Sequence, residues 1–200
     1  MTGTHVSLEP MRFDHVDEIV RAASGDRSTF EWTQVPDGPA ATRTYVQWLL
    51  DDAEHGAAAP FVQRRLSDGI VVGCTRYLNP LWPLGRDDPD EVEIGGTWLS
   101  VDAQRSAVNS EAKLLLLGHA FDQWKVQRVA ICTDARNRRS RAAIERLGAT
   151  FEGVLRRHRR STGPGEQLQL RDTAAYSVVR DEWPPIRDRL RAMIRPSASS

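Results

Sequence analysis

The stretch EIGGTWLSVDAQRSAVNSEAKLLLLGHAF, residues 93–121, decides the fold of this chain. Its first part reads as a β-strand that ends in a turn of small and polar residues. Its second part reads as a helix that carries Leu114, Leu117 and Phe121 on one face. At such a junction the free N–H groups of the first helical turn point outward, with the positive end of the helix dipole behind them. The stretch therefore predicts a site where backbone groups hold an anion.

Size and composition narrow the class of protein. A chain of 200 residues with 40% hydrophobic content predicts one α/β or α+β domain, which we place at residues 1–195, with 196–200 as a disordered tail. The 27 basic residues balance the 27 acidic residues, so no overall field favours nucleic acid or a membrane as a partner.

Cysteine and apolar patterning indicate a soluble, cytoplasmic protein. Cys74 and Cys132 lie in apolar runs, which predicts buried free thiols in a reducing compartment. The histidines show no metal-ligand spacing, so we expect no metal. No apolar run approaches the roughly 18 residues that a membrane helix needs.

Alternating and helical apolar patterns predict the other elements. Asp14 and Pro39 are placed to begin two early helices, the second of which ends near His55. Residues 79–90 contain three prolines, which favours a surface loop. The expected strands cover residues 5–9, 61–66, 70–78, 91–101, 127–133, 151–159 and 168–179, and later helices cover 137–147 and 184–194.

A second informative segment is TDARNRRSRAAIERLGATFEG, residues 133–153. Here a strand ends, Asn137 is positioned to cap a helix, and Gly148 is positioned to end it. By itself this is an ordinary strand-to-helix connection, with Ser140 as an ordinary residue of the first turn.

Together the two segments resemble the GNAT family of N-acetyltransferases, in particular its RimJ/RimL-like branch. In that family the pattern Q/R-x-x-G-x-G/A at a strand-to-helix turn holds the pyrophosphate of coenzyme A. Asn137 and Ser140 match the family's N-x-x-S, and Asn109 to Ala112 echo the branch's Asn-Thr-Glu-Ala. The pyrophosphate turn corresponds here to Gln104, Arg105, Ser106, Ala107, Val108 and Asn109.

The resemblance implies a mixed, mostly antiparallel twisted sheet of about seven strands flanked by helices. It implies transfer of an acetyl group from acetyl-CoA to a primary amine by direct attack in a ternary complex. The acceptor would be a protein N-terminus or a small molecule, and a homodimer is compatible with the family. Besides the turn, the donor site would include Leu99, Ser100, Val101, Ser110, Asn137, Ser140 and Arg141, and the acceptor pocket would include Trp32, Tyr45 and Trp48.

Two catalytic roles follow from the resemblance. Glu93, on the strand that leads into the turn, is the candidate base that removes a proton from the amine, although an exposed strand carboxylate is an equal interpretation. Many relatives protonate the leaving thiolate with a tyrosine, but Ile144 occupies that place, which leaves Ser140 as the candidate. A backbone N–H near Leu99 to Val101 would polarise the thioester carbonyl.

Both glycines of the family's turn are replaced, by Ala107 and Asn109, and the second replacement is typical of the branch. Alanine disfavours positive φ, so Ala107 would weaken coenzyme A binding if the turn needs that conformation.

Two other functions are consistent with the sequence. A non-catalytic acyl-CoA-binding or regulatory protein is suggested by Ala107 and by the missing tyrosine. A nucleic-acid-binding module is suggested by the basic run over residues 156–160, although alternation along a strand favours a solvated face there. The sequence leaves open which amine is the acceptor and whether the donor is acetyl-CoA or a longer acyl-CoA such as succinyl-CoA.

Overall fold

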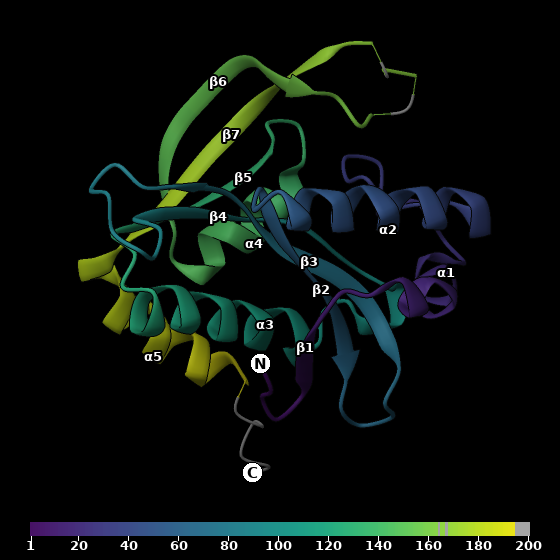
Figure 1. Ribbon diagram of the computed structural model, residues 1–200, viewed down its shortest axis with the longest axis horizontal. Coiled ribbons are helices and arrows are strands. Elements are labelled where there is room, and N and C mark those ends of the chain that lie inside the picture. The colour runs from purple at the N-terminus through teal and green to yellow at the C-terminus, as the bar shows by residue number, and fades with distance from the viewer. Residues whose placement is uncertain (164, 167, 195–200) are drawn as a thin grey trace.

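The computed structural model describes residues 1–163, 165–166 and 168–194, and its strands form one twisted sheet (Figure 1). Within the described residues the sheet has seven strands in the order β1-β2-β3-β4-β5-β7-β6. All neighbours are antiparallel except β4 and β5, which confirms the predicted mixed, mostly antiparallel sheet. The strands are β1 (Val6–Pro10), β2 (Ala58–Arg65), β3 (Val71–Leu81), β4 (Glu91–Leu99), β5 (Arg128–Asp134), β6 (Thr150–Arg160) and β7 (Leu170–Val179).

Two hydrophobic cores join the helices to the sheet. One core contains Leu116, Ile144 and Leu190, from the helices α3, α4 and α5, with Val92 and Ile94 of β4. In Figure 1, α3 and α5 lie side by side, and β6 and β7 project together beyond the rest of the molecule. The helices are α1 (Val16–Ala23), α2 (Gly38–Glu54), α3 (Ala107–Gly118), α4 (Arg138–Leu147) and α5 (Trp183–Ile194).

The second core belongs to the N-terminal helices. Ile19 of α1 and Leu49 of α2 pack with Val62 of β2 and Trp98 of β4. Because Ile94 and Trp98 of the same strand belong to different cores, β4 must change the direction of its side chains between them. A β-bulge does this: the register with β3 shifts between Cys74 and Arg76, and Gly96 takes a φ of 56°.

Strands β4 and β5 pair over only three residues. Glu91, Val92 and Glu93 face Arg128, Val129 and Ala130. Beyond these pairs β4 stays with β3 as far as Leu99, and β5 stays with β7 as far as Asp134. The two strands therefore diverge, and we call the region between residues 94–99 of β4 and 131–134 of β5 the fork.

The structure corrects two local predictions. Asp14 does not cap the first helix: a 3-10 turn over Phe13–His15 comes first, and the Asp14 carboxylate binds the Arg12 side chain. Strand β3 runs on to Leu81, so the loop is shorter than expected and begins after that residue. The buried Asp90 holds this loop by accepting hydrogen bonds from the Leu84 N–H and the Arg86 side chain.

The predicted tail, residues 196–200, lies outside the described residues. The single domain over residues 1–195 stays a prediction. In the part of the chain that is described, no helix is long and apolar enough to cross a membrane.

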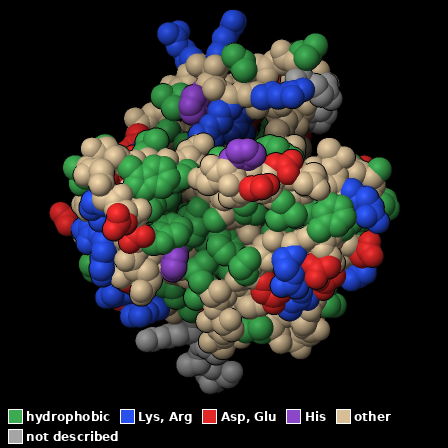
Figure 2. All heavy atoms as spheres, viewed as in Figure 1, with side chains coloured by type: hydrophobic (Ala, Val, Ile, Leu, Met, Phe, Trp, Pro, Cys, Tyr) green, Lys and Arg blue, Asp and Glu red, His purple; other side chains and the backbone are tan. Residues whose placement is uncertain are grey.

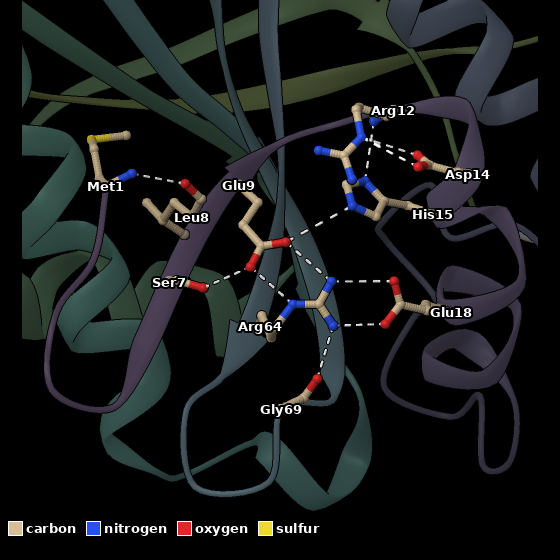
Figure 3. Close-up of polar contacts among 10 residues, drawn as sticks. All are labelled: Met1, Ser7, Leu8, Glu9, Arg12, Asp14, His15, Glu18, Arg64 and Gly69. Atoms are coloured by element: carbon tan, nitrogen blue, oxygen red, sulfur yellow. Dashed lines mark hydrogen bonds and ion pairs between the residues drawn. The ribbon is translucent and has the colours of Figure 1, made fainter.

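Arg64 of β2 links strand β1 and helix α1 through an ion-pair network (Figure 3). Its guanidinium binds Glu9 of β1 and Glu18 of α1 with two hydrogen bonds each, and it also donates to the Gly69 carbonyl oxygen. The guanidinium lowers the pKa of both carboxyl groups, because it stabilises their charged forms. This contact sets the position of α1 and hence of the second core.

Gly73 allows β3 to approach β4, and its replacement by alanine tests this contact. The added Cβ would lie 2.0 Å from the Trp98 carbonyl oxygen, so the strands would have to move apart. We expect Gly73→Ala to lower the free energy of unfolding by about 3 kcal/mol, the upper end of the range for overpacking. Urea denaturation measures it.

Gly118→Ala is the matched control. Its Cβ would lie 3.7 Å from the Trp183 ring, an ordinary contact, and alanine favours a helix by up to about 1 kcal/mol. Equal stability of the two variants would contradict the close approach at Gly73.

Candidate functional site

The start of α3 has the geometry of an anion site. Ser106 caps the helix, since its hydroxyl oxygen accepts from the Val108 N–H at 3.3 Å and donates to the Ala103 carbonyl at 2.6 Å. The other N–H groups of the first turn point away from the helix. A hollow of about 330 Å³ adjoins this turn, and its lining includes His5 and Arg65. That these backbone groups hold an anion stays a prediction.

The strained residue of the turn is Arg105. Its φ is +60°, whereas Ala107 is the first residue of α3 and is not among the residues with positive φ. The condition for a cost at Ala107 is therefore not met, because alanine suits a helical conformation well. The left-handed conformation falls two positions earlier, on a residue with a long side chain.

The start of α4 lies across the fork from the start of α3. The Asn137 Oδ1 accepts from the Ser140 N–H at 3.0 Å, and Gly148 ends the helix with a φ of 111°, as predicted. Gln104 connects the two sides. Its Nε2 donates to the Leu99 carbonyl at 3.0 Å, and its Oε1 accepts from Arg139 at 2.7 Å. The turn before α3 and the first turn of α4 thus frame the open end of the fork.

Of the backbone groups expected to face the thioester, one is already used. The Ser100 N–H donates to the Val72 carbonyl of β3 at 2.7 Å. The Leu99 carbonyl accepts from Gln104 on the opposite edge of β4, the edge toward the fork. In an extended strand the N–H and C=O of one residue point to the same edge. The Leu99 N–H is therefore the group that faces the fork.

Glu93 lies where the fork begins, in a hollow of about 420 Å³. Its side chain is buried, with 5% of the residue exposed, which excludes the interpretation as an exposed strand carboxylate. The lining comes from five strands and consists of Asn79, Leu81, Glu91, Glu93, Arg128, Ala130, Cys132, Glu152, Gly153, Val154, Leu155, His158, Arg159 and Ala175. The hollow gives an outside molecule a route to the carboxylate.

The Glu93 carboxylate is held by two partners. Arg159 donates to Oε1 at 2.7 Å and to Oε2 at 2.6 Å, and Asn79 donates to Oε2 at 3.0 Å. Oε1 therefore keeps one lone pair without a partner. Gly95 leaves space beside it, because a Cβ there would come within 3.4 Å of Oε1 and 2.9 Å of Leu78. The orientation of the carboxylate is therefore fixed, and one lone pair of Oε1 remains available to an outside molecule.

The residues of the basic run at 156–160 differ in their surroundings because Arg159 pairs with Glu93. Arg159 turns into the hollow, whereas Arg156, Arg157 and His158 are exposed. Figure 2 shows Lys and Arg side chains on the projecting end formed by β6 and β7. The predicted solvated face is therefore correct for the exposed residues and wrong for Arg159.

The two cysteines are free thiols and neither is activated. Burial raises the pKa of Cys132 to about 11, and burial raises that of Cys74 still further. Both are thus protonated at neutral pH. Among the described residues, no group of three or more His, Cys, Asp or Glu is arranged to hold a metal ion.

The three predicted acceptor-site aromatics lie outside the lining of the hollow. Tyr45 is buried in the second core, where it accepts from the Trp98 indole at 3.4 Å. The Arg76 guanidinium stacks on Trp48, with its central carbon 5.0 Å from the ring centroid. The Arg136 guanidinium stacks on Trp32 next to the start of α4, with its central carbon 4.0 Å from the ring centroid.

The remaining predicted donor residues differ in their surroundings. The Ser140 side chain is half-buried and makes no hydrogen bond to another described residue. Arg141 is turned toward β7, because it donates to the Tyr176 hydroxyl at 3.0 Å and the Ala135 carbonyl at 3.3 Å. Ile144, which occupies the place of the family's tyrosine, is buried in the first core.

Several residues of the site carry no signal in the sequence. Arg159 lies in a run of arginines, and Asn79 lies in a segment predicted to be a loop. Arg139 meets Gln104 from a helix that begins more than 30 residues later. Only Gly95 had a signal, since a glycine within a strand often marks a bulge or a close approach.

Comparison with known proteins gives a consistent result. The family model described as an acetyltransferase (GNAT) domain matches residues 5–150. A protein of Bacillus subtilis (strain 168) named as a candidate ribosomal N-acetyltransferase, YdaF, is 25% identical over 178 residues, which cover 88% of this chain and 90% of the relative.

Solved structures agree with the sequence relatives. A candidate acetyltransferase from T. thermophilus is 33% identical and superimposes with a TM-score of 0.81, covering 98% of this chain and 96% of that chain. Mycobacterium smegmatis RimJ in complex with CoA-disulfide is 23% identical with a TM-score of 0.75, covering 94% of this chain and 88% of that chain. The second likeness shows the fold alone.

The turn before α3 gives a test with opposite signs at two positions. Arg105→Gly should raise the free energy of unfolding by about 0.5–1 kcal/mol, because the left-handed cost exceeds the entropy that glycine adds. Ala107→Gly should lower it by up to about 1 kcal/mol, because glycine disfavours a helix. Thermal and urea unfolding measure both. If Ala107→Gly stabilised the protein and Arg105→Gly destabilised it, the strained residue would be Ala107 and not Arg105.

Proposed function

Because the chain belongs to the GNAT family of acetyltransferases, we propose that it moves the acetyl group of acetyl-CoA onto a primary amine that reaches Glu93 through the hollow. The chain is an N-acetyltransferase that uses acetyl-CoA. The observation that supports this site is the buried Glu93 at the point where β4 and β5 part, with one lone pair of Oε1 still available. We therefore prefer this function to the non-catalytic and nucleic-acid-binding alternatives.

In this proposal the donor enters from the open end of the fork. The N–H groups at the start of α3 that the Ser106 cap leaves free, in Ser106, Ala107 and Asn109, hold the pyrophosphate. The pantetheine arm lies between the diverging strands, where Asn137 of the facing helix start binds one of its amides. The Leu99 N–H donates to the thioester carbonyl and stabilises the negative charge that develops on its oxygen.

Glu93 acts as the base. An ordinary amine has a pKa near 10 and is mostly protonated at neutral pH, so one proton must leave before attack. Glu93 Oε1 accepts it, directly or through a water, while Arg159 and Asn79 hold the carboxylate in place. The amine nitrogen then attacks the carbonyl carbon, the C–S bond breaks, and the amide and the thiol form.

Ser140 is the group we assign to the leaving sulfur. Its hydroxyl has no partner among the described residues and lies in the first turn of α4, beside the open end of the fork. A serine hydroxyl is a weak acid, so it stabilises the thiolate by a hydrogen bond or passes a proton through water.

A protein N-terminus is the acceptor that we propose first, and a small-molecule amine second. The hollow of about 420 Å³ has room for the end of a peptide. Its lining carries three glutamates against two arginines, which leaves an excess of negative charge to attract an ammonium group. The name of the relative YdaF refers to ribosomal N-acetylation. Such an acceptor would place the protein in the cytoplasm.

The acceptor is tested by following thiol release from acetyl-CoA with peptides of varied N-terminal residue and with small amines. Turnover with peptides only supports the first choice, and turnover with small amines only supports the second. Binding of coenzyme A without turnover of any amine would contradict the proposed reaction.

Glu93→Gln tests the base. The amide keeps the size of the side chain but cannot accept the proton, so kcat/KM should fall by about 10²–10⁴ while coenzyme A binding persists. Glu91→Gln is the matched control, because Glu91 lines the same hollow and pairs with Arg128 instead. Similar losses in both variants would assign the effect to the charge of the hollow.

Ser140→Ala tests the leaving-group role. The cap of α4 uses the backbone N–H of Ser140, so the substitution leaves this hydrogen bond in place. We expect kcat to fall roughly tenfold, the value of one hydrogen bond to a charged group, with an unchanged dissociation constant for coenzyme A. An unchanged kcat would remove Ser140 from the mechanism.

A further inference from the structure

Lys113 is a buried amine that the proposed reaction does not use. It lies in α3, where 7% of the residue is exposed, and no carboxylate pairs with it among the described residues. Its Nζ donates to the Thr97 Oγ1 at 2.7 Å. A buried cation without a counter-charge costs free energy, and such costs are concentrated at functional sites.

The partner of Lys113 belongs to the fork. Thr97 follows the β-bulge of β4, in the stretch that has no β5 neighbour. Its hydroxyl also makes a 2.8 Å hydrogen bond with Thr75 of β3. Through this hydrogen bond Lys113 contacts the part of β4 along which the pantetheine arm is proposed to lie.

A second unpaired group lies on the same face of α3. The Asn109 Oδ1 is buried and has no partner among the described residues. Residues four apart on a helix are neighbours, so Asn109 stands between the anion-binding turn and Lys113. Asn109, Lys113 and Thr97 thus form a row of polar groups from the start of α3 to the fork.

We propose that Lys113 is a positioning residue of the donor site, which holds Thr97 in the fork and takes up a proton when a pyrophosphate group binds at the start of α3. This inference rests on the proposed donor site. About six residues of helix, at ~1.5 Å each, separate Lys113 from that turn, so the added negative charge would act on the amine over about 9 Å.

The direction of the effect follows from the state of the free protein. Burial lowers the pKa of Lys113 to about 7, so a large part of its population is neutral just above neutral pH. A bound anion favours the charged form and raises this pKa. Binding therefore takes up a proton, and affinity should be greatest below pH 7 and fall as the pH rises above it.

Two histidines lie at the ends of α3: His5 lines the hollow at its start, with Nε2 3.3 Å from the Ile194 carbonyl oxygen, and His119 packs against the Tyr77 and Trp124 rings. The other titratable groups around α3 have partners. Glu111 of α3 accepts from the backbone N–H groups of residues 4–6, and the N-terminal ammonium donates to the Leu8 carbonyl. Tyr77 of β3 donates to the Leu116 carbonyl. Arg187 and Arg191 of α5 pair with Asp188. Burial is the sole cause of the shift at Lys113, and none of these charges contributes to it.

The chain offers a direct readout, because Lys113 and Lys125 are its only lysines. In protein labelled with ¹³C-lysine, the Cε signal of Lys113 should titrate near pH 7 and move to higher pH when dephospho-CoA is added. This probe keeps the pyrophosphate but lacks the phosphate monoester that itself titrates near pH 6. The Cε signal of the exposed Lys125, which donates to the Asp122 carbonyl, is the internal control and should not change when dephospho-CoA is added.

Binding measured by calorimetry from pH 6 to pH 9 completes the test. The wild type should lose affinity about tenfold over this range, and Lys113→Met should lose this dependence while Lys125→Met keeps it. A Lys113 signal that does not respond to bound dephospho-CoA, or an unchanged pH profile in Lys113→Met, would overturn the inference and leave the proposed function intact. No binding of coenzyme A to the wild type at any pH would overturn both.

Discussion

The divergence of β4 from β5 after three residue pairs is the constraint on which the rest of this structure depends. A strand that leaves its neighbour exposes backbone N–H and C=O groups that need partners. Here the exposed edge of β4 lies near the starts of α3 and α4, where the Ser106 and Asn137 caps each use one N–H group of the first turn and leave others without a partner in the helix. One change in strand pairing thus gathers three sets of backbone donors around a single space. A ligand with amide and phosphate groups, such as acetyl-CoA, complements them.

Two buried charged side chains lie on the two sides of this divergence. On one side Arg159 and Asn79 bind Glu93, and on the other Lys113 binds Thr97. Glu93 and Lys113 would each cost less free energy on the surface, whereas the two cores around them are apolar. The concentration of such costs at the fork fits a site arranged for chemistry, where charges must be present and fixed before the substrate arrives.

The sequence predicted the features that are local in the chain. The Asn137 cap and the Gly148 stop depend on residues within α4, and both are present in the structure. The ion pair of Glu93 with Arg159 joins residues 66 positions apart, and it depends on how β6 folds back over β4 and β5, which no local pattern describes. The role of Lys113 was hidden for the same reason, because within α3 it reads as an ordinary helical lysine. At this turn the family pattern misled, since the residue with positive φ is Arg105, which the pattern does not mark as a glycine, and not Ala107.

Whether the fork is the donor site can be measured by hydrogen–deuterium exchange with and without coenzyme A. We expect slower exchange on binding at Leu99, over residues 106–109, and at the start of α4, because these N–H groups would be covered or hydrogen-bonded. Helix α1, which lies in the second core, should exchange as before. Protection confined to α1, or to the lining of the Glu93 hollow, would show that coenzyme A does not bind in the fork.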